Sequence, residues 1–162
     1  MQIALTPEIF LRPATLEDAP ALASVLATMD ERAAPTELEH QAMRETLIDM
    51  ARYPDFCAYL LFERDQLVGT FSLMVFPSPS HHGFQQALLD GVAILPEKRG
   101  QGLGEMMIRQ AMRLASDKHC YKLMLSSNLK RVAAHRFYEN LGFTQHGLSF
   151  SIQFAASCNN CA

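Results

Sequence analysis

The sequence lacks the features that mark membrane-spanning, secreted and nucleic-acid-binding proteins. No apolar run approaches the roughly 18 residues of a membrane-spanning helix. The first residues contain no basic segment followed by an apolar core, which a secretion signal would need. The net charge is −3, so no general surface for nucleic acid is indicated. We therefore expect neither a membrane nor a nucleic acid as a partner.

Cysteine is also scarce, with four residues scattered at positions 57, 120, 158 and 161. Cys57 and Cys120 lie in apolar stretches, as reduced core cysteines do. Cys158 and Cys161 have the spacing of a redox or zinc motif, but they lie in a polar chain end without a second ligand pair. We therefore expect no metal site, and a cytoplasmic protein, because disulfides are rare in that compartment.

The length and composition of the chain favour one globular domain. Of its 162 residues, 49% are apolar and 19% are charged, which is a globular rather than a disordered profile. Internal repeats, linkers and low-complexity segments are lacking as well. We expect a single domain over residues 1–156 and a short C-terminal tail over residues 157–162.

Hydrophobic periodicity predicts an alternation of strands and helices. Strands are expected over residues 9–12, 56–62, 67–76, 86–95, 121–126, 143–146 and 149–154. A first helix is expected from Leu16 to Leu26, with Thr15 and Asp18 as a capping pair at its start. A second is expected after a polar connection over residues 29–39 and before Pro54. Two more are expected over residues 102–116 and 129–141. This order indicates an α/β fold, in which helices cover both faces of a mixed sheet.

The most informative stretch runs from Asp90 to Met107 and joins an apolar strand, a glycine-rich turn and a helix start. Val92 to Leu95 fit a buried strand, which Pro96 ends because proline cannot donate to a sheet ladder. Backbone N–H groups without a helical partner converge where the helix starts, and the helix dipole adds partial positive charge. The stretch therefore predicts a phosphate-binding loop.

Two common phosphate-binding motifs are absent from this loop. The dinucleotide fingerprint would need a glycine at the position of Glu105, and the P-loop would need Gly-Lys-Ser or Gly-Lys-Thr. The chain instead has Arg99-Gly100-Gln101-Gly102-Leu103-Gly104, which matches Gln/Arg-x-x-Gly-x-Gly/Ala. This run resembles the pyrophosphate loop of the Gcn5-related N-acetyltransferase (GNAT) family. A glycine-rich turn without a ligand is the alternative interpretation.

A second motif about 40 residues later strengthens the resemblance. Residues 135–143 read His-Arg-Phe-Tyr-Glu-Asn-Leu-Gly-Phe and are similar to the Phe-Tyr-Glu-x-x-Gly-Phe helix end of that family, with Gly142 as the C′ glycine. Residues 120–125 are similar to the same region of its small bacterial members. The resemblance covers nearly the whole chain. It implies the GNAT fold, which is a mixed, mostly antiparallel central sheet of six to seven strands with helices on both faces.

The resemblance also implies acetyl-CoA as co-substrate, bound between two strands that splay apart. Coenzyme A would hydrogen bond to strand backbone near Val92 and Ile94, and an N–H near Ala93 or Ile94 would polarise the acetyl carbonyl. The pyrophosphate would rest on N–H groups of the loop, which are those of Arg99, Gly100, Gln101, Gly102, Leu103 and Gly104. Many members add an asparagine on the next helix, but this chain has Arg131 there. Either Asn128 substitutes or that contact is missing.

Tyr138 and Asp90 are the catalytic candidates that the resemblance implies. Tyr138 matches the family tyrosine that often lies near the sulfur and can act as a general acid, and its alternative role is packing plus one hydrogen bond. Asp90 takes the place where many members carry an acidic residue beside the acceptor. It could accept the amine proton, bind a cationic acceptor, or be a plain surface carboxylate.

These residues favour an N-acetyltransferase that moves an acetyl group from acetyl-CoA to an amine, most simply on a small molecule. Acetylation of protein N-termini or lysines and a non-catalytic acyl-CoA sensor remain as alternatives, and the presence of Asp90 and Tyr138 argues against the sensor. In the resembled fold, His81 and His82 lie in a loop that faces the acceptor. Because adjacent histidines cannot easily direct both rings to one metal, an acceptor contact or a surface position is expected. A homodimer is an open expectation.

Overall fold

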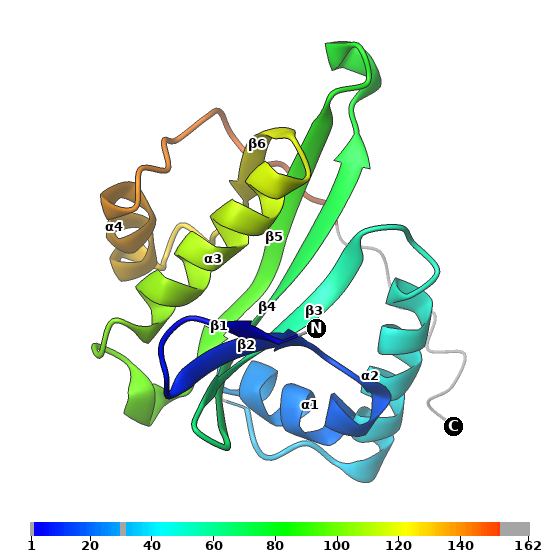
Figure 1. Cartoon of the computed structure of the whole chain (residues 1–162), viewed down its shortest axis with the longest axis vertical. Coiled ribbons are helices and arrows are strands. Elements are labelled where there is room, and N and C mark those ends of the chain that lie inside the picture. The colour runs from blue at the N-terminus through cyan, green and yellow to red at the C-terminus, as the bar shows by residue number, and fades with distance from the viewer. Residues whose placement is uncertain (1, 30–31, 153–162) are drawn as a thin grey trace. The chain divides into compact units, whose positions relative to one another are not determined.

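The computed structural model describes residues 2–29 and 32–152, and its centre is a six-stranded sheet (Figure 1). The strands lie in chain order, and they are β1 Ile3–Ala4, β2 Ile9–Pro13, β3 Phe56–Glu63, β4 Gln66–Pro77, β5 Gln85–Ile94 and β6 Cys120–Leu125. Neighbours from β1 to β5 pair antiparallel, whereas β5 and β6 pair parallel. The expected mixed, mostly antiparallel sheet is confirmed.

Four α-helices accompany the sheet in the described residues, and they are α1 Ala19–Ala27, α2 Glu37–Met50, α3 Leu103–Asp117 and α4 Val132–Asn140. Short 3-10 turns, η1 Leu16–Asp18, η2 Pro79–His81 and η3 Pro96–Lys98, precede α1, β5 and α3. The chain divides after Leu125 into two compact units, and α4 belongs to the second.

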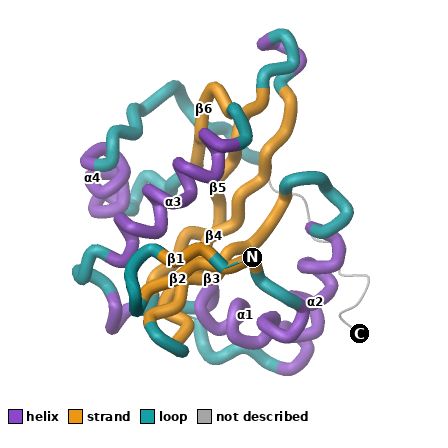
Figure 2. Tube along the Cα trace, viewed as in Figure 1, coloured by secondary structure: helices purple, strands orange, loops and turns teal. Residues whose placement is uncertain are grey.

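Helices cover both faces of the sheet. Leu60 of β3 packs in one buried cluster with α1 and with Leu47 of α2. The neighbouring Leu61 points to the opposite face, because side chains alternate along a strand. There its strand partner Gly69 lies beside Met107 of α3. The same arrangement, with α1 and α2 on one side and α3 on the other, can be followed in Figure 2.

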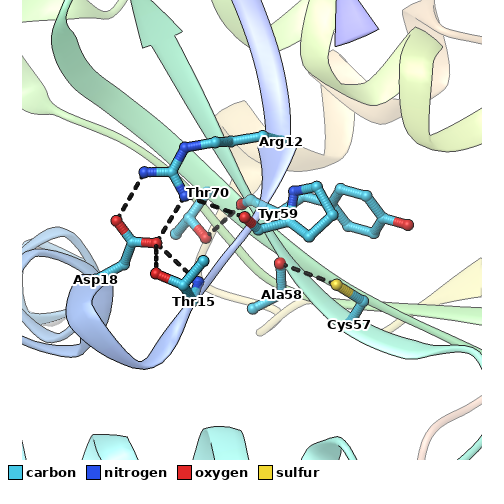
Figure 3. A network of polar contacts seen from close by, with 8 residues as sticks. Arg12, Thr15, Asp18, Cys57, Ala58, Tyr59 and Thr70 are labelled. Atoms are coloured by element: carbon cyan, nitrogen blue, oxygen red, sulfur yellow. Dashed lines mark hydrogen bonds and ion pairs between the residues drawn. The ribbon is translucent and has the colours of Figure 1, made fainter. Parts of the chain in front are cut away.

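An ion pair ties β2 to the start of the first helix (Figure 3). The Arg12 guanidinium meets the Asp18 carboxylate through two hydrogen bonds of 2.6 and 2.8 Å. The same carboxylate accepts from the backbone N–H of Thr15 at 2.7 Å and from its hydroxyl at 2.9 Å. The expected capping pair is therefore confirmed. The hydrogen bonds from Arg12, with those from Thr15, lower the pKa of Asp18 from 3.8 to about 2.

Replacing Asp18 by asparagine should lower the free energy of unfolding at neutral pH by about 2 kcal/mol. This is the stabilisation that follows when folding lowers the pKa of a carboxyl group from 3.8 to about 2. Because folding depresses the pKa, the stabilisation is full above the ordinary pKa of 3.8 and is lost as the pH falls towards about 2. Urea unfolding of both proteins over this pH range measures the difference. Asp49→Asn, which breaks an exposed pair with Arg52, is the control and should cost less than about 1 kcal/mol. A difference for Asp18→Asn that does not shrink at low pH would contradict this explanation.

Near the N-terminus, one helix starts earlier than expected and one short strand was not expected. Helix α2 starts at Glu37, inside the expected polar connection, because Thr36 and Glu39 form a capping box. The Thr36 N–H donates to the Glu39 carboxylate at 2.8 Å, and the Glu39 N–H donates to the Thr36 hydroxyl at 3.4 Å. The short strand β1 was not expected, and it exists because Ile3 and Ala4 pair with β2.

The end of the described chain corrects four further expectations. Helix α4 starts at Val132 rather than at residue 129, and Ala133, expected to face inward, is exposed. The strand expected over 143–146 is absent, as is the part of the next one that the structure describes, 149–152. A strand needs a neighbour to accept and donate its hydrogen bonds, and these residues pair with none in the described chain. Residues 153–154, the tail over 157–162 and its two cysteines lie outside the described residues.

Candidate functional site

Strand β5 loses its partner on one side half-way along its length. It pairs with β6 from Gln85 to Leu89, which faces Leu125, the last residue of β6. On its other side β5 stays paired with β4 as far as Ile94. The edge of β5 from Asp90 to Ile94 therefore has no strand neighbour in the described residues. An edge of this kind leaves backbone N–H and C=O groups available for a ligand.

A β-bulge lies at the start of this open edge. Thr70 of β4 faces Ala93, but Ser72 faces Asp90, so Gly91 and Val92 together oppose one residue. The φ angle of Gly91 is +58°, which glycine adopts at little cost. A Cβ atom at Gly91 would lie 3.5 Å from Cδ2 of Leu26, at the end of α1. The bulge therefore bends β5 directly beside the end of α1.

The loop between β5 and α3 presents a run of unbonded N–H groups. Gly100 and Gly102 have φ angles of +75° and +79°, and α3 begins directly afterwards. Among the described residues, none of the backbone N–H groups from Gly100 to Glu105 meets a hydrogen-bond acceptor. These donors lie in the loop and in the first turn of α3, a helix of 15 residues whose dipole adds partial positive charge. The arrangement suits an anion such as a pyrophosphate.

Contacts with the neighbouring strands and with the β3–β4 hairpin anchor this loop. The N–H of Leu95 donates to the carbonyl of Val68 at 2.9 Å. The Lys98 ammonium pairs with the Glu63 carboxylate at 2.5 Å, which ties η3 to the β3–β4 hairpin. Arg99 donates through Nε to the carbonyl of Ile94 at 3.1 Å. The predicted pyrophosphate residues thus offer backbone groups in a loop that is already anchored.

Asp90 lies at the bulge, next to the open edge. Its side chain is exposed, and its backbone carbonyl accepts from the Ser72 hydroxyl at 3.3 Å. Its carboxylate makes no hydrogen bond or ion pair with any described residue. The group is therefore free to meet an acceptor amine.

Tyr138 belongs to the second unit, where it packs among aromatic rings. Its ring makes edge contacts with Phe137 and Phe143, at centroid distances of 5.3 and 5.6 Å. Burial raises the pKa of the Tyr138 phenol above its ordinary value, against the opposing charge of Arg131. The helix ends as expected, because Gly142 has a φ angle of +95° and donates to the carbonyl of Glu139.

Asn128, also in the second unit, organises the turn before α4. Its side-chain oxygen accepts from the N–H of Lys130 at 2.9 Å, and its backbone carbonyl accepts from the N–H of Arg131 at 2.9 Å. The His135 ring nitrogen Nε2 lies 3.0 Å from the same carbonyl. The side-chain N–H₂ group of Asn128 makes no hydrogen bond with another described residue.

The two histidines lie at the tip of the β4–β5 hairpin, beyond the end of β5 that is remote from the glycine loop (Figure 1). The His81 ring is 4.8 Å from the ring of Tyr121, and His82 is exposed. Within residues 2–29 and 32–152, no three His, Cys, Asp or Glu side chains are placed to hold a metal ion. In the same residues, no helix has both the length and the apolar character needed to cross a membrane.

The structure thus brings together most of the predicted site in the first unit: the open edge with Val92, Ala93 and Ile94, the loop over 99–104, and Asp90. Tyr138 and Asn128 lie in the second unit. The bulge was missed, although an isolated glycine inside an apolar strand pattern is a known signal for one. The contacts of Leu26 and Ser72 with the bulge carry no sequence signal.

Comparison with known proteins agrees with this geometry. The model of the acetyltransferase (GNAT) family matches residues 25–143. An aminoalkylphosphonate N-acetyltransferase of Salmonella typhimurium is 30% identical over 146 residues, which are 90% of this chain and 91% of that protein. A glucosamine 6-phosphate N-acetyltransferase of Trypanosoma brucei brucei is 36% identical over 81 residues, which are 50% of this chain and 53% of that protein.

A solved structure from Agrobacterium tumefaciens shares the fold. It has 28% sequence identity and a TM-score of 0.79, and the match covers 89% of this chain and 99% of that one. The family match spans more than half of the chain and includes both the glycine loop and the helix that carries Tyr138. The chain therefore belongs to the acetyltransferase (GNAT) family, whose N-acetyltransferases take the acetyl group from acetyl-CoA, and it is an acyl-transferring enzyme.

Proposed function

We propose that this enzyme acetylates the amine of a small molecule that also carries a phosphonate or phosphate group. The observation that carries the proposal is the run of unbonded N–H groups from Gly100 to Glu105, beside an open strand edge and a free carboxylate at Asp90. The acceptor class is supported by the Salmonella typhimurium and Trypanosoma brucei brucei relatives, which are named for small amines that carry a phosphonate or a phosphate.

In this proposal acetyl-CoA lies along the open edge of β5 and ends on the glycine loop. The backbone of Val92, Ala93 and Ile94 hydrogen bonds to the pantetheine arm, and an N–H near Ala93 or Ile94 polarises the acetyl carbonyl. Asn128 offers its side-chain N–H₂ group to the same arm. The N–H groups of residues 100–104 hold the pyrophosphate, because donors at a helix start are suited to bind it. The N–H of Arg99, which was also expected to contribute, instead donates to the carbonyl of Pro96 at 3.3 Å.

The reaction needs one proton removed and one supplied. The amine nitrogen attacks the thioester carbonyl, a C–N bond forms, and the C–S bond breaks to release coenzyme A. We assign the removal of the amine proton to Asp90, since its carboxylate is exposed and unengaged beside the bulge. We assign the protonation of the leaving thiolate to Tyr138, since it matches the family tyrosine and a phenol carries its proton at neutral pH.

Replacing Asp90 by asparagine should lower the turnover number about fivefold, below the usual range of general base catalysis, because some free amine reacts without a base. The acetyl-CoA affinity should be nearly unchanged. Steady-state kinetics beside direct titration measure both quantities. Asp65→Asn, an exposed carboxylate in the β3–β4 turn, is the matched control. Full turnover with a higher acceptor KM would show instead that Asp90 only binds the acceptor.

The acceptor class is tested by comparing kcat/KM for three amines. An aminoalkylphosphonate should exceed the matched alkylamine without the phosphonate at least tenfold, which corresponds to about 1.4 kcal/mol. Equal values for the two would remove the anionic group from the proposal. A higher value for a peptide with a free N-terminus or lysine would favour a protein acetyltransferase. Binding of acetyl-CoA without transfer to any amine would favour a sensor.

The number of domains, the location of the protein and its lack of a nucleic-acid partner are also proposals. A single domain over residues 1–156 is supported by the family match, which crosses the division after Leu125. A cytoplasmic location is supported by Cys57 and Cys120, which are free thiols. The expectation that nucleic acid is not a partner is supported by the net charge of −3. A homodimer remains a prediction.

A further inference from the structure

Gly69 of β4 lies where a side chain would have no room. A Cβ atom built there would be 2.5 Å from Cδ1 of Ile94, 2.8 Å from the carbonyl oxygen of Ala93 and 3.4 Å from Sδ of Met107. Real Cβ atoms essentially never come within 3.0 Å of another heavy atom. Ala93 and Met107 are themselves buried, so neither has free space behind it.

Gly69 is needed for a different reason from the glycines of the loop. Gly100 and Gly102 have positive φ angles, and a Cβ atom on either would meet nothing within 4 Å. Gly69 lies in ordinary strand backbone, where its partner across the sheet is Ile94. The loop glycines therefore supply a backbone conformation, whereas Gly69 supplies space.

Both parts of the proposed donor site, the open edge of β5 and the start of α3, border the space beside Gly69. The Ala93 carbonyl belongs to the peptide unit between Ala93 and Ile94, on the open edge of β5. Met107 lies one turn after Leu103, so its position sets that of the first turn of α3. A methyl group at residue 69 would have to displace the β5 backbone at the Ala93 carbonyl, and it would also press on the Met107 side chain of α3.

We propose that Gly69 is a positioning residue for acetyl-CoA, because its missing side chain sets the spacing between the open edge of β5 and the start of α3. The inference rests on the proposed donor site. Ile94 can turn its side chain away from a methyl group, but the Ala93 oxygen is backbone and can move only with the strand. Gly69 does not touch the substrate and acts through the N–H groups that do.

The test is Gly69→Ala, measured by titration with acetyl-CoA, by steady-state kinetics and by thermal unfolding. The dissociation constant of acetyl-CoA should rise about fivefold and turnover should fall by a similar factor, since donors must be held close to their productive geometry. Val75→Ala is the matched control, because it loosens the same strand by removing buried atoms opposite Ala87, away from the open edge of β5. It should lower the melting temperature and leave the acetyl-CoA affinity within about twofold.

A second substitution checks the mechanism. Ile94→Val removes the Cδ1 atom that is closest to the added methyl group. In an Ile94→Val background, Gly69→Ala should therefore raise the dissociation constant less than in the wild type, yet still measurably, because the Ala93 oxygen remains. If Gly69→Ala alone does not fold, the test is the dissociation constant of the double variant against that of Ile94→Val alone, which should again be lower than that of the double variant.

The inference is overturned if folded Gly69→Ala binds and turns over acetyl-CoA as the wild type does. It is also overturned if Val75→Ala weakens acetyl-CoA binding to the same extent, because the effect would then be one of stability. Gly102→Val separates these results from a failure of the donor site itself. If Gly102→Val weakens acetyl-CoA binding and Gly69→Ala does not, the donor site stands and only the role of Gly69 is wrong.

Discussion

Replacing Tyr138 by phenylalanine is expected to lower turnover about 10- to 100-fold, at the lower end of general acid catalysis. The change removes the hydroxyl and keeps the ring, whose edge contacts with Phe137 and Phe143 fill the same space. A hydroxyl that protonates the leaving thiolate acts in the transition state, so the loss should fall on turnover and not on ground-state binding. The coenzyme A thiolate is a fair leaving group, which is why we expect the lower end.

Steady-state kinetics and direct titration separate these effects. The acetyl-CoA affinity of Tyr138→Phe should change less than about threefold, since the packing of the ring is kept. Tyr53→Phe, which removes an exposed hydroxyl just after α2, is the control and should leave turnover unchanged. Wild-type turnover in Tyr138→Phe would exclude the acid role and leave Tyr138 as a packing residue.

Replacing Gly102 by valine should weaken acetyl-CoA binding at least tenfold, a loss of about 1.4 kcal/mol. At a φ angle of +79°, a β-branched residue is strained, so the loop must change its backbone and redirect its N–H groups. A Cβ atom at Gly102 meets no protein atom within 4 Å, so the fold should tolerate the change. A bound phosphate would meet that side chain directly.

Gly83 is a matched control for this substitution. It has the same φ angle of +79° and the same open surroundings, but it lies at the tip of the β4–β5 hairpin. Gly83→Val should therefore carry a similar backbone strain and leave acetyl-CoA affinity unchanged. Titration of both variants distinguishes loss of the loop from general strain. Unchanged affinity in folded Gly102→Val would remove the loop from the donor site.

The elements of the donor site could be predicted because local chemistry determines them. Pro96 ends the strand, alternate glycines mark the turn, and the helix pattern begins at Leu103. The capping box that moves the start of α2 to Glu37 was also readable, since Thr36 is followed three residues later by Glu39. The apolar residues at helical spacing begin only at Met43, which is why periodicity alone places the start too late.

The features that shape the site depend on contacts between distant segments. The bulge at Gly91 follows from the register of β4 against β5, and the need for glycine at position 69 follows from Ile94 and Met107, which lie far along the chain. Within the described residues, the closing strands predicted over 143–146 and 149–152 were wrong for the same reason. Leu148 and Phe150 alternate with polar residues, but alternation makes a strand only where a neighbour pairs with it.

The most direct test of the account is a thiol-release assay with acetyl-CoA and a panel of amines, which includes aminoalkylphosphonates, amino sugar phosphates, plain alkylamines and peptides. The account predicts that wild-type enzyme releases the coenzyme A thiol with small amines, fastest with those that carry a phosphonate or phosphate. It also predicts that Gly102→Val loses this activity at subsaturating acetyl-CoA, while Gly83→Val keeps it. Release with peptides alone, or no release above the enzyme-free rate with any amine, would contradict it.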